Sequence, residues 1–126
     1  MKKIGFIGMG NMASAIAGGI IKSGFIEGQN VYAFDIDQTK LLKMNEEYQI
    51  QCCNSESELV DKVDLVVMAV KPNIVEGVIA KIKNNLVNKA VISIVAGYNN
   101  DKYNEYNNLY TMYLVKEFLP NSFVLE

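Results

Sequence analysis

Two hydrophobic periods alternate along most of this chain. Short runs of apolar and β-branched residues, typical of buried strands, are separated by longer segments with apolar residues at helical spacing. The pattern predicts strands at Lys3–Ile7, Val31–Phe34, Ile50–Cys53, Asp64–Val70 and Ala90–Val95. It predicts helices at Met12–Lys22, Thr39–Glu47, Ser55–Val60 and Ile74–Leu86.

This alternation of strand and helix indicates a single α/β domain with a Rossmann-type, doubly wound parallel sheet of five to six strands. The run Asp64–Val70 is nearly continuous in apolar residues, as expected for a parallel strand covered by helices on both faces. Ser55 is a candidate N-cap for the helix that follows it. Pro72 is expected to end the fourth strand.

Beyond Gly97 the composition changes. Residues 98–126 hold five of the seven tyrosines and many asparagines. The segment fits a polar helix at Asn99–Asn107 followed by a sixth, edge strand at Leu109–Val115, or else a poorly packed tail. Because tyrosine offers apolar area with a polar tip, we expect self-association through this tail.

A glycine-rich loop joins the first strand to the first helix. Its sequence, Gly8-Met9-Gly10-Asn11-Met12-Ala13, follows a strand and opens a helix, which is the context that a dinucleotide-binding GxGxxG motif requires. Gly8 permits the tight turn, and Gly10 lacks the Cβ that would hold a pyrophosphate away from the backbone. The N–H groups of Asn11 and Met12 then face the phosphates. A structural glycine turn in an α/β protein that binds no nucleotide is the alternative.

The end of the second strand bears on the choice of cofactor. Asp35 stands where the adenosine ribose would lie and can accept hydrogen bonds from both ribose hydroxyls, which favours NAD(H). Its charge would repel the 2′-phosphate of NADP(H), and Asp37 adds to that repulsion. NADP(H) stays possible, since Lys40 is close enough in sequence to reach such a phosphate. Asp35 could instead be a strand-end or helix-capping aspartate, and Asp37 is the better candidate for the cap of the next helix.

Composition excludes several other classes of function. The net charge of −2 and the lack of a basic cluster give no reason to expect a nucleic-acid partner. With no histidine and only the adjacent Cys52 and Cys53, the chain has almost nothing from which to build a zinc site, and two reduced thiols are expected. The run Leu65–Val70 is far shorter than the ~20 residues that span a bilayer, so we expect no membrane partner and a cytoplasmic protein.

The segments GFIGMGNMASAI, MAVKP and SIVAG resemble pyrroline-5-carboxylate reductase, over roughly Lys3 to Gly97. That family reduces the C=N bond of 1-pyrroline-5-carboxylate to L-proline with NADH or NADPH. The resemblance implies a dinucleotide-binding domain at residues 1–97 with a nicotinamide dinucleotide as its partner. It implies a cofactor site at Gly8, Met9, Gly10, Asn11, Met12, Asp35, Val70, Lys71, Pro72, Ala96 and Gly97, and it implies no catalytic residue in this chain.

The chain departs from the family in two ways. Many members carry Ser or Asn with basic neighbours where Asp35 stands, so an NADP preference is not inherited. The family's C-terminal helical domain, which binds substrate, has no counterpart before Glu126, so we expect this chain to be inactive by itself.

Lys71 also fits a solvated strand-end lysine. The alternative functions are a fragment of a hydroxyacid dehydrogenase or of a deazaflavin-linked NADP reductase, and a non-catalytic NAD-binding module.

Overall fold

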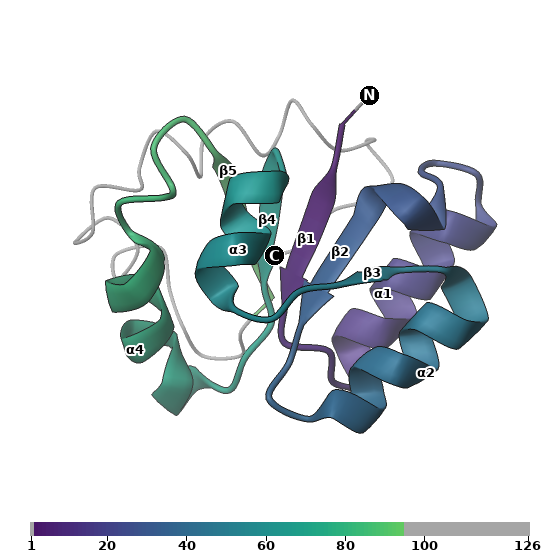
Figure 1. The fold of residues 1–126 in the computed structure, drawn as a ribbon, viewed down its shortest axis with the longest axis horizontal. Helices are drawn as coiled ribbons and strands as arrows, with labels where there is room; N and C mark the ends of the chain where they lie inside the picture. The colour runs from purple at the N-terminus through teal and green to yellow at the C-terminus, as the bar shows by residue number, and fades with distance from the viewer. Residues whose placement is uncertain (1, 95–126) are drawn as a thin grey trace.

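Five parallel strands form one sheet in the computed structural model, which describes residues 2–94 (Figure 1). The strands are β1 (Ile4–Ile7), β2 (Val31–Phe34), β3 (Gln51–Cys52), β4 (Leu65–Met68) and β5 (Ala90–Ser93). The connecting helices are α1 (Asn11–Lys22), α2 (Gln38–Tyr48), α3 (Glu56–Lys62) and α4 (Pro72–Ile82), and a 3-10 helix, η1 (Gly28–Asn30), precedes β2. The strand order is β3-β2-β1-β4-β5, so the direction of winding reverses between β1 and β4. The predicted Rossmann-type fold is confirmed.

Helices cover both faces of the sheet, with α1 and α2 on one side and α3 and α4 on the other (Figure 1). Alternate strand residues supply the two cores, since Phe6 and Val67 pack with the α1 and α2 side, whereas Ile7 and Met68 pack with the α3 and α4 side. Burial on both faces explains why these strands are apolar throughout rather than alternating.

Four strands are shorter than predicted. β1 begins at Ile4 rather than Lys3, and β5 ends at Ser93, before Ile94. The ladder of β4 ends at Met68. Val70 lies beyond the strand and packs, partly buried, against the core beneath α3 and α4. The third strand retains only Gln51–Cys52, which pair with β2 at the edge of the sheet. Hydrophobicity reports burial, and a buried loop residue gives the same signal as a strand residue.

The last helix begins earlier and ends earlier than predicted. Pro72 is the first helical residue of α4 rather than a mere strand stop, since its fixed φ and missing N–H suit the first turn. The helix ends at Ile82, and Leu86 is buried from the turn that follows it.

Both predicted helix caps are confirmed. The Ser55 hydroxyl accepts a hydrogen bond from the N–H of Glu58 at 3.1 Å, and the Asp37 carboxylate accepts one from the N–H of Thr39 at 3.0 Å. Within residues 2–94, no helix is long and apolar enough to cross a membrane. The predicted helix Asn99–Asn107 and strand Leu109–Val115 lie outside the described residues.

Candidate functional site

Three loops meet at the carboxyl ends of the central strands. They follow β1, β2 and β4, and they lie together at the lower end of the sheet in Figure 1. Because the winding reverses between β1 and β4, the helices that follow these two strands, α1 and α4, pack on opposite faces of the sheet. Open α/β sheets bind their ligands at this position.

The glycine loop turns sharply as it leaves β1. Gly8 has a φ of +97°, a conformation that L side chains rarely adopt, and its N–H donates to the carbonyl oxygen of Phe34 at 2.8 Å. A Cβ built on Gly8 would lie 2.7 Å from the carbonyl oxygen of Ala69 and 3.1 Å from the backbone nitrogen of Val70. Glycine is therefore required here both for the turn and for the close approach of the loop after β4.

Gly10 faces open space. It is the N-cap residue of α1, its φ is −75°, and a Cβ built on it would meet nothing within 4 Å. The first helical bond runs from the N–H of Ser14 to the carbonyl oxygen of Gly10 at 2.9 Å, so the N–H groups of residues 11–13 precede the ladder. Asn11 and Met12 are exposed, and no side chain caps this end. An anion fits here, at the positive end of the helix dipole.

Asp35 makes two hydrogen bonds to backbone at this end of the sheet. Its Oδ2 accepts from the N–H of Met9 at 2.7 Å, and its Oδ1 accepts from the N–H of Asp37 at 2.8 Å. The helix-capping alternative for Asp35 is wrong, since the cap of α2 is Asp37. The sequence suggested a carboxylate for the ribose hydroxyls and did not suggest a bond to the glycine loop.

The loop after β2 presents an exposed apolar side chain between its two acids. Ile36 is 84% exposed, whereas the Asp35 side chain beside it is half-buried. Hydrogen bonds from the side chain and the backbone of Thr39 lower the pKa of Asp37, and the charge of Lys40 lowers it further. Two carboxylates and one lysine therefore lie between the end of β2 and the first turn of α2.

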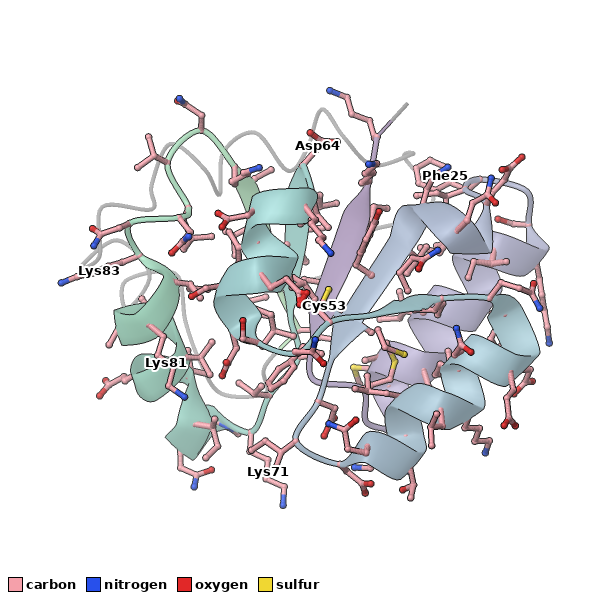
Figure 2. The ribbon with its side chains drawn as sticks, viewed as in Figure 1. Phe25, Cys53, Asp64, Lys71, Lys81 and Lys83 are labelled. Atoms are coloured by element: carbon pink, nitrogen blue, oxygen red, sulfur yellow. The ribbon has the colours of Figure 1, made fainter. Side chains whose placement is uncertain are left out.

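The loop after β4 brings Val70 against Gly8 and exposes the next two residues. Lys71 is the N-cap residue of α4 and makes no side-chain cap bond, and Pro72 follows it as the first helical residue. Figure 2 shows Lys71 at the same end of the molecule as the three loops. The structure thus gathers the predicted residues 8–12, Asp35 and 70–72 at one end of the sheet. The remaining two, Ala96 and Gly97, lie outside the described residues.

A groove between α1 and α2 opens beside the glycine loop and was not predicted. Its volume is about 300 Å³. It is lined by Met9, Asn11, Ser14, Ala15, Lys40, Lys43, Met44, Glu47 and Tyr48. The α2 residues recur at helical spacing, which marks them as one face, but only the packing of the helices identifies the partner face on α1.

Both cysteines are free thiols, as predicted. Cys53 is buried, and desolvation raises its pKa to about 11. Cys52 is exposed and donates to the carbonyl oxygen of Leu41 at 3.5 Å. Among residues 2–94, no group of three histidine, cysteine or acidic side chains is placed to hold a metal ion.

A family model described as "NADP oxidoreductase coenzyme F420-dependent" matches residues 3–97. The chain belongs to this family. The matched range covers the glycine loop, the ends of all five strands and the boundary predicted at Gly97.

Within the family, the curated relatives are pyrroline-5-carboxylate reductases, which confirms the resemblance. The enzyme of Escherichia coli K12 is 35% identical over 102 residues, which are 80% of this chain and 38% of that protein. The enzyme of Methanosarcina acetivorans is 36% identical over 97 residues, which are 76% of this chain and 36% of that protein.

Solved structures give the same relationship. The pyrroline carboxylate reductase of Plasmodium falciparum, with NADP bound, is 33% identical with a TM-score of 0.73, over 83% of this chain and 37% of that one. The Coxiella burnetii enzyme is 27% identical with a TM-score of 0.78, over 83% and 39%. The chain therefore spans little more than a third of the length of the relatives it matches, and that part is their NAD(P)-binding domain.

Proposed function

We propose that this chain binds a nicotinamide dinucleotide with the pyrophosphate against the start of α1. The observation that carries the proposal is the open space over Gly10, next to the N–H groups of residues 11–13 that precede the helical ladder. A phosphate in this space would accept from those N–H groups without displacing any side chain.

On the adenosine side, we assign the ribose to Asp35 and an apolar contact with the adenine to the exposed Ile36. Each oxygen of Asp35 already accepts one backbone N–H and has a further lone-pair site for a ribose hydroxyl. The carboxylates of Asp35 and Asp37 disfavour a 2′-phosphate, so NADH is the proposed cofactor. Lys40, beside Asp37, is the one nearby side chain of the loop after β2 and the start of α2 that would favour NADPH.

On the nicotinamide side, we assign the cofactor to Val70, Lys71 and Pro72, and to Ala96 and Gly97 beyond the described residues. A bound reduced nicotinamide supplies a hydride. From the likeness to the reductases, we propose that the reaction this cofactor site serves is hydride transfer to the C=N carbon of 1-pyrroline-5-carboxylate, which yields L-proline. What the described residues do is bind the cofactor and orient its ring at the carboxyl end of β4.

We further propose that the 126-residue chain supplies only the cofactor half of this reaction. Hydride transfer needs the donor and acceptor carbons in near-attack geometry, which takes walls on both sides of the substrate. The matched residues span only 36% and 38% of the lengths of the Methanosarcina acetivorans and Escherichia coli enzymes. The chain alone should therefore bind NADH yet form no proline above background.

The test is a calorimetric titration of wild-type protein, Gly10→Val and Gly19→Val with NADH. Both glycines border open space, but Gly19 lies about two and a half turns along α1 from Gly10, so Gly19→Val is the matched control. Gly10→Val should abolish NADH binding and Gly19→Val should retain it. Circular dichroism should show that the sheet is intact in each variant. Equal affinities for the two variants would contradict the site.

The name of the family favours a second candidate, a reductase that exchanges hydride between NADP and a deazaflavin. Adding reduced coenzyme F420 and NADP to the same protein, and following NADPH absorbance, separates the two candidates. Turnover with F420 would support the second candidate and contradict the first.

A further inference from the structure

The Asp35 carboxylate connects two loops of the candidate site. One oxygen accepts the N–H of Met9 at 2.7 Å, and the other accepts the N–H of Asp37 at 2.8 Å. Met9 lies in the loop after β1, 26 residues earlier in the chain, and Asp37 caps α2. A single half-buried side chain thus ties the glycine loop to the loop after β2.

The bond to Met9 follows from the turn at Gly8. The N–H of Gly8 still donates to the end of β2, at 2.8 Å from the carbonyl oxygen of Phe34. The positive φ of Gly8 then turns the next peptide out of the sheet, so the N–H of Met9 needs an acceptor that is not in the ladder. Met9 as a whole is only 1% exposed, so its N–H has little access to water. Asp35 supplies the acceptor.

We propose that Asp35 is a positioning residue of the cofactor site, whose carboxylate sets the conformation of the glycine loop before a dinucleotide binds. The proposal rests on the proposed dinucleotide function and adds a second role to the ribose contact. A carboxylate that acted only on the ribose would leave the free loop unchanged on replacement. If the carboxylate holds the loop, its replacement changes the glycine loop of the free protein as well.

The first experiment measures the free protein. Asp35→Ser removes the carboxylate oxygen that accepts the Met9 N–H, and amide hydrogen exchange by NMR should show the Met9 amide exchanging at least about tenfold faster. Asp37→Asn removes the same charge two residues away but leaves the Met9 bond, so the exchange of Met9 should be unchanged. The Gly8 amide, bonded to Phe34, serves as the internal reference. Unchanged exchange of Met9 in Asp35→Ser would overturn the proposal.

The second experiment separates the loop from the ribose. Wild-type protein and Asp35→Ser are titrated with NADH and with an NADH analogue that lacks both hydroxyls of the adenosine ribose. Loss of the loop tie should weaken both ligands by about five- to tenfold, because the phosphate contacts are less well organised. If the analogue binds both proteins equally, Asp35 acts through the ribose alone and the positioning role is wrong.

These outcomes are distinguishable from a failure of the proposed function. Wild-type protein that binds neither NADH nor NADPH would contradict the dinucleotide function itself. Wild-type protein that binds NADH, with the analogue unaffected by the substitution, would contradict only the positioning role. Should Asp35→Ser fail to fold, Asp35→Asn replaces it, because its amide is of similar shape and keeps one acceptor oxygen for the two N–H groups.

Discussion

Gly8 and Ala69 are in such close contact that a Cβ on Gly8 would lie 2.7 Å from the carbonyl oxygen of Ala69. This contact joins the loop after β1 to the loop after β4, at the point where the winding of the sheet reverses. The N–H of Ala69 in turn donates to the carbonyl oxygen of Ile7 at 2.9 Å, so a backbone hydrogen bond fixes the two loops at this contact. The two sides of the candidate cofactor site are therefore held at a set separation.

We predict that Gly8→Ala destabilises the fold more than Gly10→Ala does. Gly8 combines a φ of +97° with a backbone contact that cannot move away, whereas Gly10 has an ordinary φ of −75° and open space. Strain of this kind costs about 1–3 kcal/mol of unfolding free energy. Urea denaturation followed by circular dichroism measures both variants, and equal midpoints would contradict the geometry of the loop.

The wild-type chain should bind NADH more tightly than NADPH at low salt. The carboxylates of Asp35 and Asp37 would face the 2′-phosphate, and we expect a preference of roughly tenfold that shrinks as salt screens these charges. Fluorescence titrations with the two cofactors at low and high salt give the ratio. Lys40→Gln should widen the preference. Tighter binding of NADPH to the wild type at low salt would show that the argument from Asp35 is wrong.

The unfolding free energy should fall as the pH drops through the acid range. Bonds from Thr39 lower the pKa of Asp37, and the backbone N–H of Asn54 lowers the pKa of Glu58. A carboxylate with a lowered folded pKa stabilises the fold above its unfolded pKa of about 4, and this contribution is lost as pH falls through the folded pKa. Chemical denaturation at several pH values measures the loss.

Asp37→Asn is the matched variant for that pH experiment. Asparagine also caps helices well, so stability near neutral pH should change little, while the loss at acid pH should become smaller. A variant with the same acid sensitivity as the wild type would exclude Asp37 as a source of the effect.

Alkylation should distinguish the two cysteines. Cys53 is 2% exposed with a pKa raised to about 11, whereas Cys52 is exposed. Because the thiolate is the reactive form and needs access, iodoacetamide at neutral pH should modify Cys52 slowly and Cys53 only after unfolding. Mass spectrometry of the labelled peptides gives the order. Equal labelling of both thiols in the folded protein would contradict the burial of Cys53.

We also expect the chain to self-associate through the tyrosine-rich residues 98–126, which lie outside the described part of the structure. Light scattering over a dilution series should show a concentration-dependent mass, and a version that stops after Gly97 should not. A monomer at every concentration would show that this expectation is wrong.

The sequence by itself determined the fold class, because burial on both faces of a parallel sheet leaves apolar runs that turn residues separate cleanly. It also located the glycine loop and the caps Ser55 and Asp37, since the conformations of tight turns and helix ends admit few residue types. These features depend on neighbours within a few positions, so a linear pattern records them.

Only the tertiary structure decided which distant residues meet. The bond from Met9 to Asp35, the contact of Gly8 with Ala69 and the groove between α1 and α2 each join elements that are far apart in the chain. The end of β4 was also decided there, since Val70 is partly buried against the core beneath α3 and α4 without belonging to the strand. Such pairings arise from the packing of helices on the sheet, and one residue's type carries no record of the partner that packing will place beside it.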